Sequence, residues 1–141
     1  MVELPGKLCL TPALLAQMQS EVERLAPEEA CGLLAGLIEA GSYQALAVLP
    51  LSNSLHSPVR FRIDASEQLA AFQQIEAQGW ELVGIYHSHP QGPEVPSATD
   101  IAEAYYPEAA YLVWSGAGGK WACRAFTILD RQVRSLVMSI D

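Results

Sequence analysis

The sequence predicts an α/β fold in a single domain, with one mixed sheet and two main helices. Two segments place apolar residues at helical spacing, whereas the other apolar runs are short and bounded by glycine or proline, as strands are. The elements follow the order strand, helix, hairpin, helix and then further strands, so a regular βαβ alternation is not expected. A chain of 141 residues fits one domain, which we assign to residues 1–141.

The first half of the chain begins with a short strand, residues 7–10, followed by a helix. Thr11 can cap this helix, which ends near residue 25. The next apolar segment is predicted to form two strands with a turn at Gly41 between them. Its first strand, residues 30–39, is nearly all apolar, which predicts a central place in the sheet.

The second half contains the second main helix and the remaining strands. Asp64 or Ser66 can cap the helix, and Gly79 ends it. A short third helix is expected at about residues 98–105, after a loop rich in proline and glycine. We expect strands at residues 60–64 ("RFRID"), 80–89 ("WELVGIYHSH"), 109–115 ("AAYLVWS"), 121–129 ("WACRAFTIL") and 132–140 ("QVRSLVMSI").

The composition argues against several classes of protein. The formal net charge is -8 and the eight basic residues are scattered along the chain, which argues against a nucleic-acid surface. The three cysteines, Cys9, Cys31 and Cys123, lie among apolar neighbours, as buried thiols in a reducing compartment do. The N-terminal "MVELPGKL" lacks the features of a signal peptide, and no apolar run is long enough for a membrane span. We therefore expect a cytoplasmic protein.

The segment "HSHPQGPEVPSATD", residues 87–100, carries the strongest chemical signal. His87 and His89 lie two apart on a predicted strand, so both point to one face of the sheet while Ser88 points to the other. Two neighbouring imidazoles are best explained by a divalent cation between them.

Asp100 is the natural third ligand, because a catalytic zinc site usually has three protein ligands and one open position for water. Ser97 can cap the short helix with Asp100 three residues later, an S-x-x-D start that holds the carboxylate rigidly. Glu29, just before the central apolar strand, is a candidate for the base that activates the water. His56 is tempting as a fourth ligand, but a fourth would close the site to water, so we assign it to structure or surface.

These residues resemble the pattern of the JAMM metalloproteases, also called the MPN+ family. That family carries a glutamate before a Cys-Gly or Met-Gly pair, and then His-x-His, seven residues, Ser, two residues and Asp. The matching residues here are Glu29-Ala30-Cys31-Gly32, His87-Ser88-His89, Ser97 and Asp100. The order of elements is similar over essentially the whole chain, and the resemblance implies a zinc-bearing α/β fold broadly like that of the cytidine deaminases.

The resemblance implies a role for each matching residue. His87, His89 and Asp100 would be the zinc ligands, and Glu29 would activate the water that is the fourth ligand. Ser97 would donate a hydrogen bond to the oxyanion. The implied reaction is zinc-dependent hydrolysis of a peptide or isopeptide bond at the C-terminal tail of ubiquitin or a ubiquitin-like protein.

In size the chain resembles the small bacterial-type members of the family, and this resemblance implies that the substrate is a small ubiquitin-like sulfur carrier, or a conjugate of one, and not a polyubiquitin chain. Relatives that cut lysine-linked polyubiquitin chains carry two insertions, whereas only about five residues separate the short helix from the strand at Ala110. The sequence leaves the oligomeric state open.

Two alternatives to a peptidase remain. A non-catalytic metal-binding scaffold would share the fold, although such relatives lack some of the ligands that are all present here. A zinc deaminase would use H-x-E with P-C-x-x-C, and this chain has no C-x-x-C. Cys31 is not expected to be a nucleophile, since the histidines that could activate it are assigned to the metal.

Overall fold

The computed structural model describes residues 3–141; Met1 and Val2, part of the segment expected to lack a signal peptide, lie outside the described residues. The elements are β1 (Lys7–Leu10), α1 (Pro12–Leu25), β2 (Cys31–Glu39), β3 (Ser42–Leu51), α2 (Ala65–Ala77), β4 (Glu81–His89), α3 (Ala98–Ala102), β5 (Ala110–Ser115), the 3-10 turn η1 (Ala117–Gly119), β6 (Ala122–Leu129), β7 (Gln132–Ser135) and β8 (Val137–Ile140). No helix in the described range is long and apolar enough to cross a bilayer.

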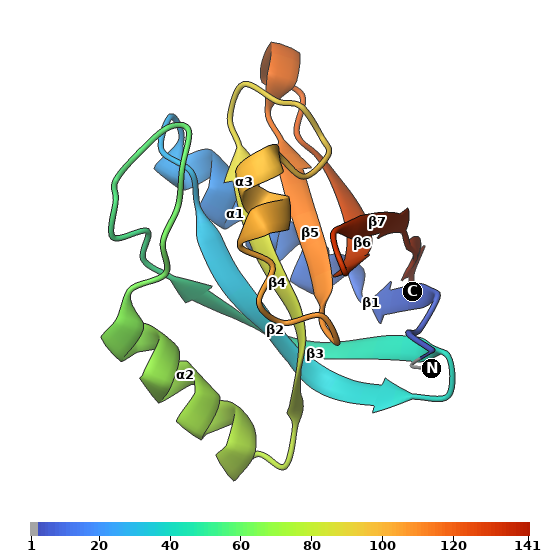
Figure 1. Cartoon of the computed structure of the whole chain (residues 1–141). Coiled ribbons are helices and arrows are strands. Elements are labelled where there is room, and N and C mark those ends of the chain that lie inside the picture. Colours follow the sequence, from blue (N-terminus) through green and yellow to red (C-terminus); the bar gives the residue numbers. More distant parts are fainter. Residues whose placement is uncertain (1–2) are drawn as a thin grey trace.

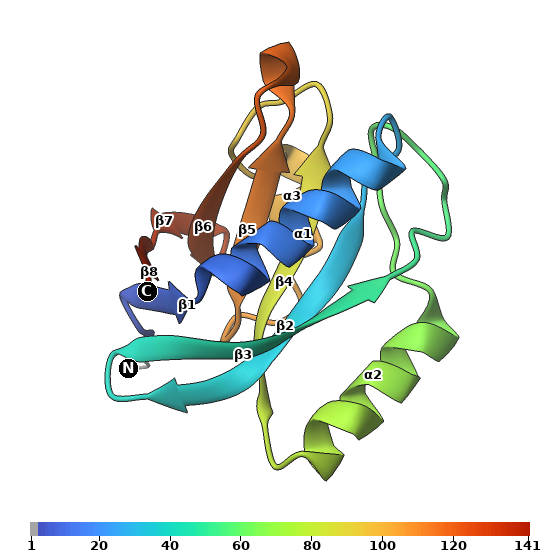
Figure 2. The same ribbon diagram turned by 180° about the vertical axis from the view of Figure 1, so that it is seen from behind.

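All eight of these strands form one mixed sheet in the order β7-β6-β5-β4-β2-β3-β1-β8. Helix α2 and the short α3 lie on one side of the sheet (Figure 1), and α1 crosses the other side (Figure 2). The mixed α/β class and the two main helices predicted from the sequence are therefore confirmed.

Each main helix buries an apolar stripe against its own side of the sheet. Met18 and Val22 of α1 belong to the larger core cluster, while Ala71 and Ile75 of α2 belong to the smaller cluster on the opposite face. The cap predicted at the start of α1 is present, since the Thr11 hydroxyl oxygen accepts a hydrogen bond from the N–H of Leu14. Burial of these stripes on both faces fixes the sheet that carries the candidate site.

The central place predicted for the apolar strand is confirmed. β2 pairs with β3 on one side and with β4 on the other, antiparallel in both cases, and β4 continues parallel to β5. Cys31 lies opposite His87 and Gly32 lies opposite Tyr86. A side chain at Gly32 would collide with the Tyr86 ring, so this position permits the close packing of the strand that carries the histidines.

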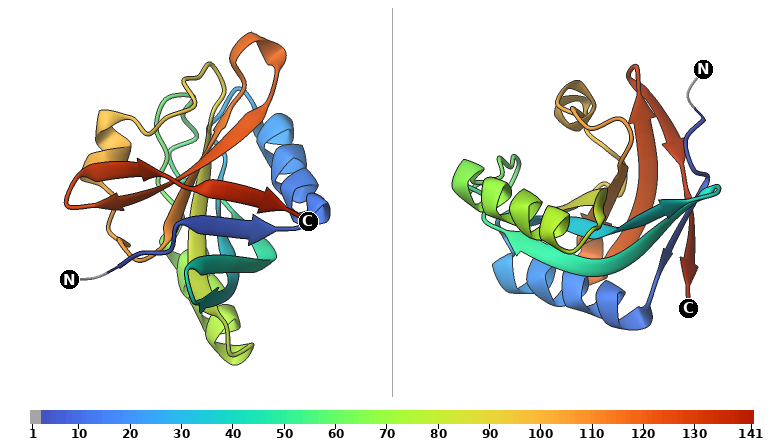
Figure 3. Two further views of the ribbon diagram at one scale, coloured as in Figure 1. Left: turned by 90° about the vertical axis from the view of Figure 1, so that its right-hand side faces the viewer. Right: turned by 90° about the horizontal axis from the view of Figure 1, so that it is seen from below.

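Three expectations about secondary structure were wrong in part. Residues 60–64 form no regular strand, and Ile63 makes only an isolated bridge to Asn53. The Asn53 side chain hydrogen-bonds the Arg60 carbonyl and the Arg62 N–H, which in a strand would pair with a neighbouring strand. The short helix α3 ends at Ala102, earlier than expected. The predicted strand 132–140 divides at Leu136 into β7, which pairs with β6, and β8, which crosses to pair with β1 (Figure 3).

Candidate metal centre

Strand β4 ends with His87 and His89 side by side on the α2 face of the sheet. Their Nε2 atoms lie 3.0 Å apart, and the two residues are only 2% and 7% exposed. Ser88 points to the other face, as predicted, where its hydroxyl oxygen accepts a 2.7 Å hydrogen bond from the Ala30 N–H. The Ser88 N–H also donates to the Ala30 carbonyl at 3.0 Å, so the histidine pair is held in register with the start of β2.

Asp100 reaches the histidines from the first turn of α3. Its Oδ2 atom lies 3.0 Å from His87 Nε2 and 3.2 Å from His89 Nε2. The same oxygen accepts a 2.8 Å bond from the Ser97 N–H, while the Ser97 hydroxyl oxygen accepts from the Asp100 N–H at 3.0 Å. This reciprocal capping box confirms the S-x-x-D helix start and fixes the direction of the carboxylate.

Glu29 approaches the same point from the residue before Ala30 and β2. Its side chain is buried, and a carboxylate oxygen lies within 4.8 Å of a ring nitrogen of His87 and of His89. The structure therefore brings all five predicted site residues, including Asp100 and Ser97, to one end of β4.

The donor atoms fit a divalent cation. His89 Nδ1 lies 2.8 Å from the Pro93 carbonyl oxygen, which can only accept, so Nδ1 carries a proton and neutral His89 presents a lone pair at Nε2. His89 Nε2 faces the Asp100 carboxylate and His87 Nε2, so a positive charge at this point, either a bound cation or a proton on Nε2, would hold the three atoms together. Their spacings of 3.0, 3.0 and 3.2 Å are close to the roughly 3.3 Å between ligands of a tetrahedral zinc ion.

Burial and neighbouring charges shift the pKa values of the four titratable groups in the cluster. Burial lowers the pKa of His87. Burial also acts to lower the pKa of His89, but the hydrogen bonds to Asp100 and to the Pro93 carbonyl, together with the nearby carboxylate charges, raise it overall. At Asp100, burial would raise the pKa, but the bonds to the two histidines and the Ser97 N–H hold it well below its ordinary value. Burial raises the pKa of Glu29 to about 7, with the Asp100 charge adding to the effect and His89 opposing it.

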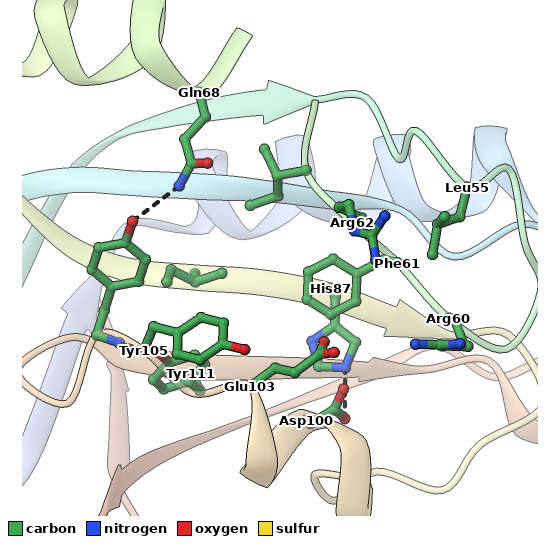
Figure 4. Close-up of a pocket in the computed structure, with 13 residues that line it drawn as sticks. Leu55, Arg60, Phe61, Arg62, Gln68, His87, Asp100, Glu103, Tyr105 and Tyr111 are labelled. Carbon is green, nitrogen blue, oxygen red and sulfur yellow. Dashed lines mark hydrogen bonds and ion pairs between the residues drawn. The ribbon is translucent and has the colours of Figure 1, made fainter. Parts of the chain in front are cut away.

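A pocket of about 270 Å³ opens beside His87 and Asp100 (Figure 4). We use the name strap for residues 52–63, the segment between β3 and α2 that forms one wall of this pocket. Strap residues and residues after Asp100 supply polar and aromatic side chains to the lining, among them Arg60, Phe61, Arg62, Glu103, Tyr105 and Tyr106. The Phe61 ring stacks on the His87 imidazole, with centroids 4.6 Å apart and planes at 20°. A molecule bound in this pocket would contact His87 and Asp100.

Two residues considered from the sequence lie apart from the chemistry. The His56 side chain is 73% exposed and its Nδ1 faces the Glu28 carboxylate at 3.7 Å, as expected for a surface residue. Burial raises the pKa of the Cys31 thiol to about 12, and its sulfur contacts the Leu51 carbonyl oxygen at 3.7 Å. A thiol with so high a pKa is a poor nucleophile at neutral pH.

The sequence interpretation missed Asn53, Phe61 and the partner of Ser88. Asn53 is buried under the strap and donates a 3.0 Å hydrogen bond to the Glu29 carbonyl. It is the chain's only asparagine, which was a visible signal, but its partners at residue 29 and at residues 60–62 are distant in sequence. The direction of Ser88 followed from strand alternation, whereas its bond to Ala30 depends on the pairing of β2 with β4.

The fold and the metal-site geometry together are those expected for the JAMM (MPN+) class. The chain belongs to the prokaryotic homologs of the JAB domain, whose family model matches residues 11–129. The resemblance identified from the sequence motif is thus confirmed.

Named relatives and a solved structure agree with this membership. The CysO-cysteine peptidase of Mycobacterium bovis is 35% identical over 127 residues, which cover 89% of this chain and 86% of that protein. The probable TtuB-protein conjugate cleaving protease of Thermus thermophilus is 36% identical over 126 residues, 89% of this chain and 78% of that protein. The desampylase of Haloferax volcanii is 40% identical over 93 residues, which cover 65% of this chain and 66% of that protein. The solution structure of protein DSY2949 from Desulfitobacterium hafniense matches with a TM-score of 0.86 and 33% identity, covering 95% of this chain and 92% of that one.

Proposed function

We propose that this protein is a zinc-dependent peptidase that hydrolyses the amide bond after the C-terminal glycine of a ubiquitin-like sulfur-carrier protein, or of a conjugate of one. The observation that carries the proposal is the convergence of His87, His89 and Asp100 on one point beside the Glu29 carboxylate. The choice of substrate is supported by two relatives, which are named for action on CysO-cysteine and on TtuB-protein conjugates.

The zinc ligands in this proposal are His87 and His89 through Nε2 and Asp100 through Oδ2. When bound there, zinc supplies a Lewis acid and lowers the pKa of a water toward about 7. Asp100 is preferred to Glu29 as the third ligand because Oδ2 lies 3.0–3.2 Å from both imidazoles, whereas Glu29 is placed only within 4.8 Å of them. The bonds from His89 to Pro93 and from the Ser97 N–H to Asp100 hold the ligands in orientation.

Glu29 is the general base. It takes a proton from the attacking water as the C–O bond forms, and it delivers that proton to the leaving nitrogen as the C–N bond breaks. A carboxyl group whose pKa is raised to about 7 by burial can both accept and return a proton near neutral pH. Its carboxylate lies within 4.8 Å of a ring nitrogen of each histidine, and it lines a second hollow, shared with Glu28 and Asn53, next to the pocket beside His87 and Asp100.

Ser97 stabilises the oxyanion. Its hydroxyl oxygen accepts the Asp100 N–H of the capping box, and a hydroxyl that accepts in this way retains a proton to donate. That proton can be directed at the substrate carbonyl oxygen, where negative charge develops in the transition state. One such donor typically lowers the barrier by about 3 kcal/mol.

The proposal is tested with a sulfur carrier such as CysO extended by a C-terminal cysteine or a short peptide. Incubation with the zinc-loaded protein should release the added residues and leave the carrier ending in glycine, as read by mass spectrometry. The matched control is Glu29→Gln, which keeps the shape of the side chain but cannot accept the proton. Efficient cleavage of lysine-linked diubiquitin with no action on any carrier fusion would overturn the choice of substrate.

The same samples separate the other two functions considered. A scaffold would bind zinc yet release nothing from any fusion or peptide, and a deaminase would release ammonia from cytidine while leaving amide bonds intact. Either result would replace the peptidase assignment.

A further inference from the structure

Asn53 is a fully satisfied buried amide at the centre of the strap. Its Nδ2 donates to the carbonyls of Glu29 and Arg60, each at 3.0 Å. Its Oδ1 accepts from the N–H groups of Leu55 at 3.1 Å and Arg62 at 3.0 Å. Both amide hydrogens and both lone pairs are thus used; only glutamine carries the same group, and its extra methylene would place that group further from the main chain.

The main chain of Glu29 is held by the strap at both of its hydrogen-bonding groups. Its carbonyl accepts from Asn53, and its N–H donates to the Ser57 carbonyl at 2.8 Å. The next residue, Ala30, is held instead by Ser88 on β4. The carboxylate proposed as the base therefore stands at a junction between the strap and the histidine strand.

The far end of the strap is tied to the same amide. The Arg60 carbonyl and the Arg62 N–H both bond to Asn53, and between them Phe61 stacks on His87. One side chain consequently links the main chain of Glu29 with the pocket wall that covers a histidine. A shift of Asn53 would move both together.

We propose that Asn53 is a positioning residue for the reaction: it fixes Glu29 and the Phe61 wall in one arrangement relative to the histidine pair. This inference rests on the proposed function, since it assumes that Glu29 is the base and that the pocket takes the substrate tail. Misplacement of a catalytic group by about 1 Å can cost a hundredfold in rate. Asn53 therefore acts through Glu29 without touching the substrate.

The kinetic test compares Asn53→Ala with Ser54→Ala on the carrier–cysteine fusion, well below the unfolding temperature of each variant. Ser54 is the matched control, because its hydroxyl donates to the Arg62 carbonyl at 3.1 Å within the strap and makes none of the hydrogen bonds to Glu29 that Asn53 and Ser57 make. We expect Asn53→Ala to lower kcat about 10- to 100-fold and also to raise KM, and Ser54→Ala to stay within about twofold of wild type. A purely structural role would reduce the active fraction and leave KM unchanged.

Amide hydrogen exchange provides a readout that does not depend on activity. The Glu29 N–H should be protected in wild type and in Ser54→Ala, and its protection should fall about tenfold or more in Asn53→Ala, together with that of Leu55 and Arg62. Unchanged protection at Glu29 in Asn53→Ala would overturn the inference, as would a kcat and KM equal to those of Ser54→Ala. If wild type cleaves no carrier fusion, the proposed function fails, while loss of Glu29 protection in Asn53→Ala alone still supports Asn53 as the residue that fixes Glu29.

Discussion

The end of β4 and the strap meet at Glu29, yet they are held in different ways. β4 is paired along its length with β2 and β5, and its two histidines are almost completely buried. The strap makes one isolated strand bridge, is largely exposed, and depends on the side chain of Asn53. The two histidines proposed as metal ligands therefore lie on a strand that is paired on both sides. The proposed base and the pocket wall depend instead on a few side-chain contacts, so we expect them to open more readily.

Removing the three proposed zinc ligands should have the largest effect on metal content and activity. This variant tests the site at the end of β4. Purified wild type is expected to hold about one zinc ion per chain. Elemental analysis of the His87→Ala, His89→Ala, Asp100→Ala triple variant should find no zinc, and its peptidase activity should be undetectable. Full zinc retention by the triple variant would show that the metal lies elsewhere.

Glu29→Gln separates the base from the ligands. The variant should keep its zinc and its fold but lose turnover by about 10² or more, because the amide cannot accept a proton. Zinc content and kcat on the carrier fusion are measured on the same sample, so that metal retention and loss of turnover are checked together. Loss of zinc in this variant would indicate that Glu29 is a ligand, and near-normal turnover with zinc bound would exclude it as the base.

Ser97→Ala tests the residue that caps α3 and lies outside both β4 and the strap. Loss of an oxyanion donor should raise the barrier by about 3 kcal/mol, whereas loss of a helix cap costs about 1 kcal/mol of stability. We therefore expect a large fall in kcat with a small fall in unfolding temperature. A variant that unfolds early but turns over normally would leave Ser97 with the capping role alone.

The smallest expected effect is the pH dependence of stability in the metal-free protein. Burial raises the pKa of Glu29 from its ordinary value of 4.5 to about 7, so the charged form is disfavoured in the fold. Its contribution to stability is complete below the unfolded pKa and is lost as the pH rises through 7, a loss of about 2–3 kcal/mol. Relative to Glu29→Gln, metal-free wild type should lose stability between pH 5 and pH 8 in urea unfolding. If the free energy of unfolding changed with pH in the same way for the two proteins, the raised pKa of Glu29 would be contradicted.

The β4 side of the site could be predicted from the sequence because its signals are local. Strand alternation placed His87 and His89 on one face, and the spacing from Ser97 to Asp100 specified a capping box. The apolar run at residues 30–39 correctly predicted a central strand. Each of these inferences needs only residues that are neighbours along the chain.

The strap could not be predicted because its structure comes from distant partners. "RFRID" has the alternation of a strand, but Asn53 bonds the main chain of Arg60 and Arg62 and bends the segment toward Glu29. The break at Leu136 was missed for a similar reason. β7 still pairs with β6, while the residues after the break pair with β1 at the other edge of the sheet, a contact that no local pattern reveals.

A growing chain makes β1 long before it makes β8. β1 joins the sheet between β3 and β8, and β8 follows it in the sequence only after the strands β2 to β7. On the ribosome the outer edge of β1 therefore has no partner, and an open edge can pair with other nascent chains. Lys7, exposed at the start of β1, places a positive charge on that edge and discourages such pairing until β8 emerges.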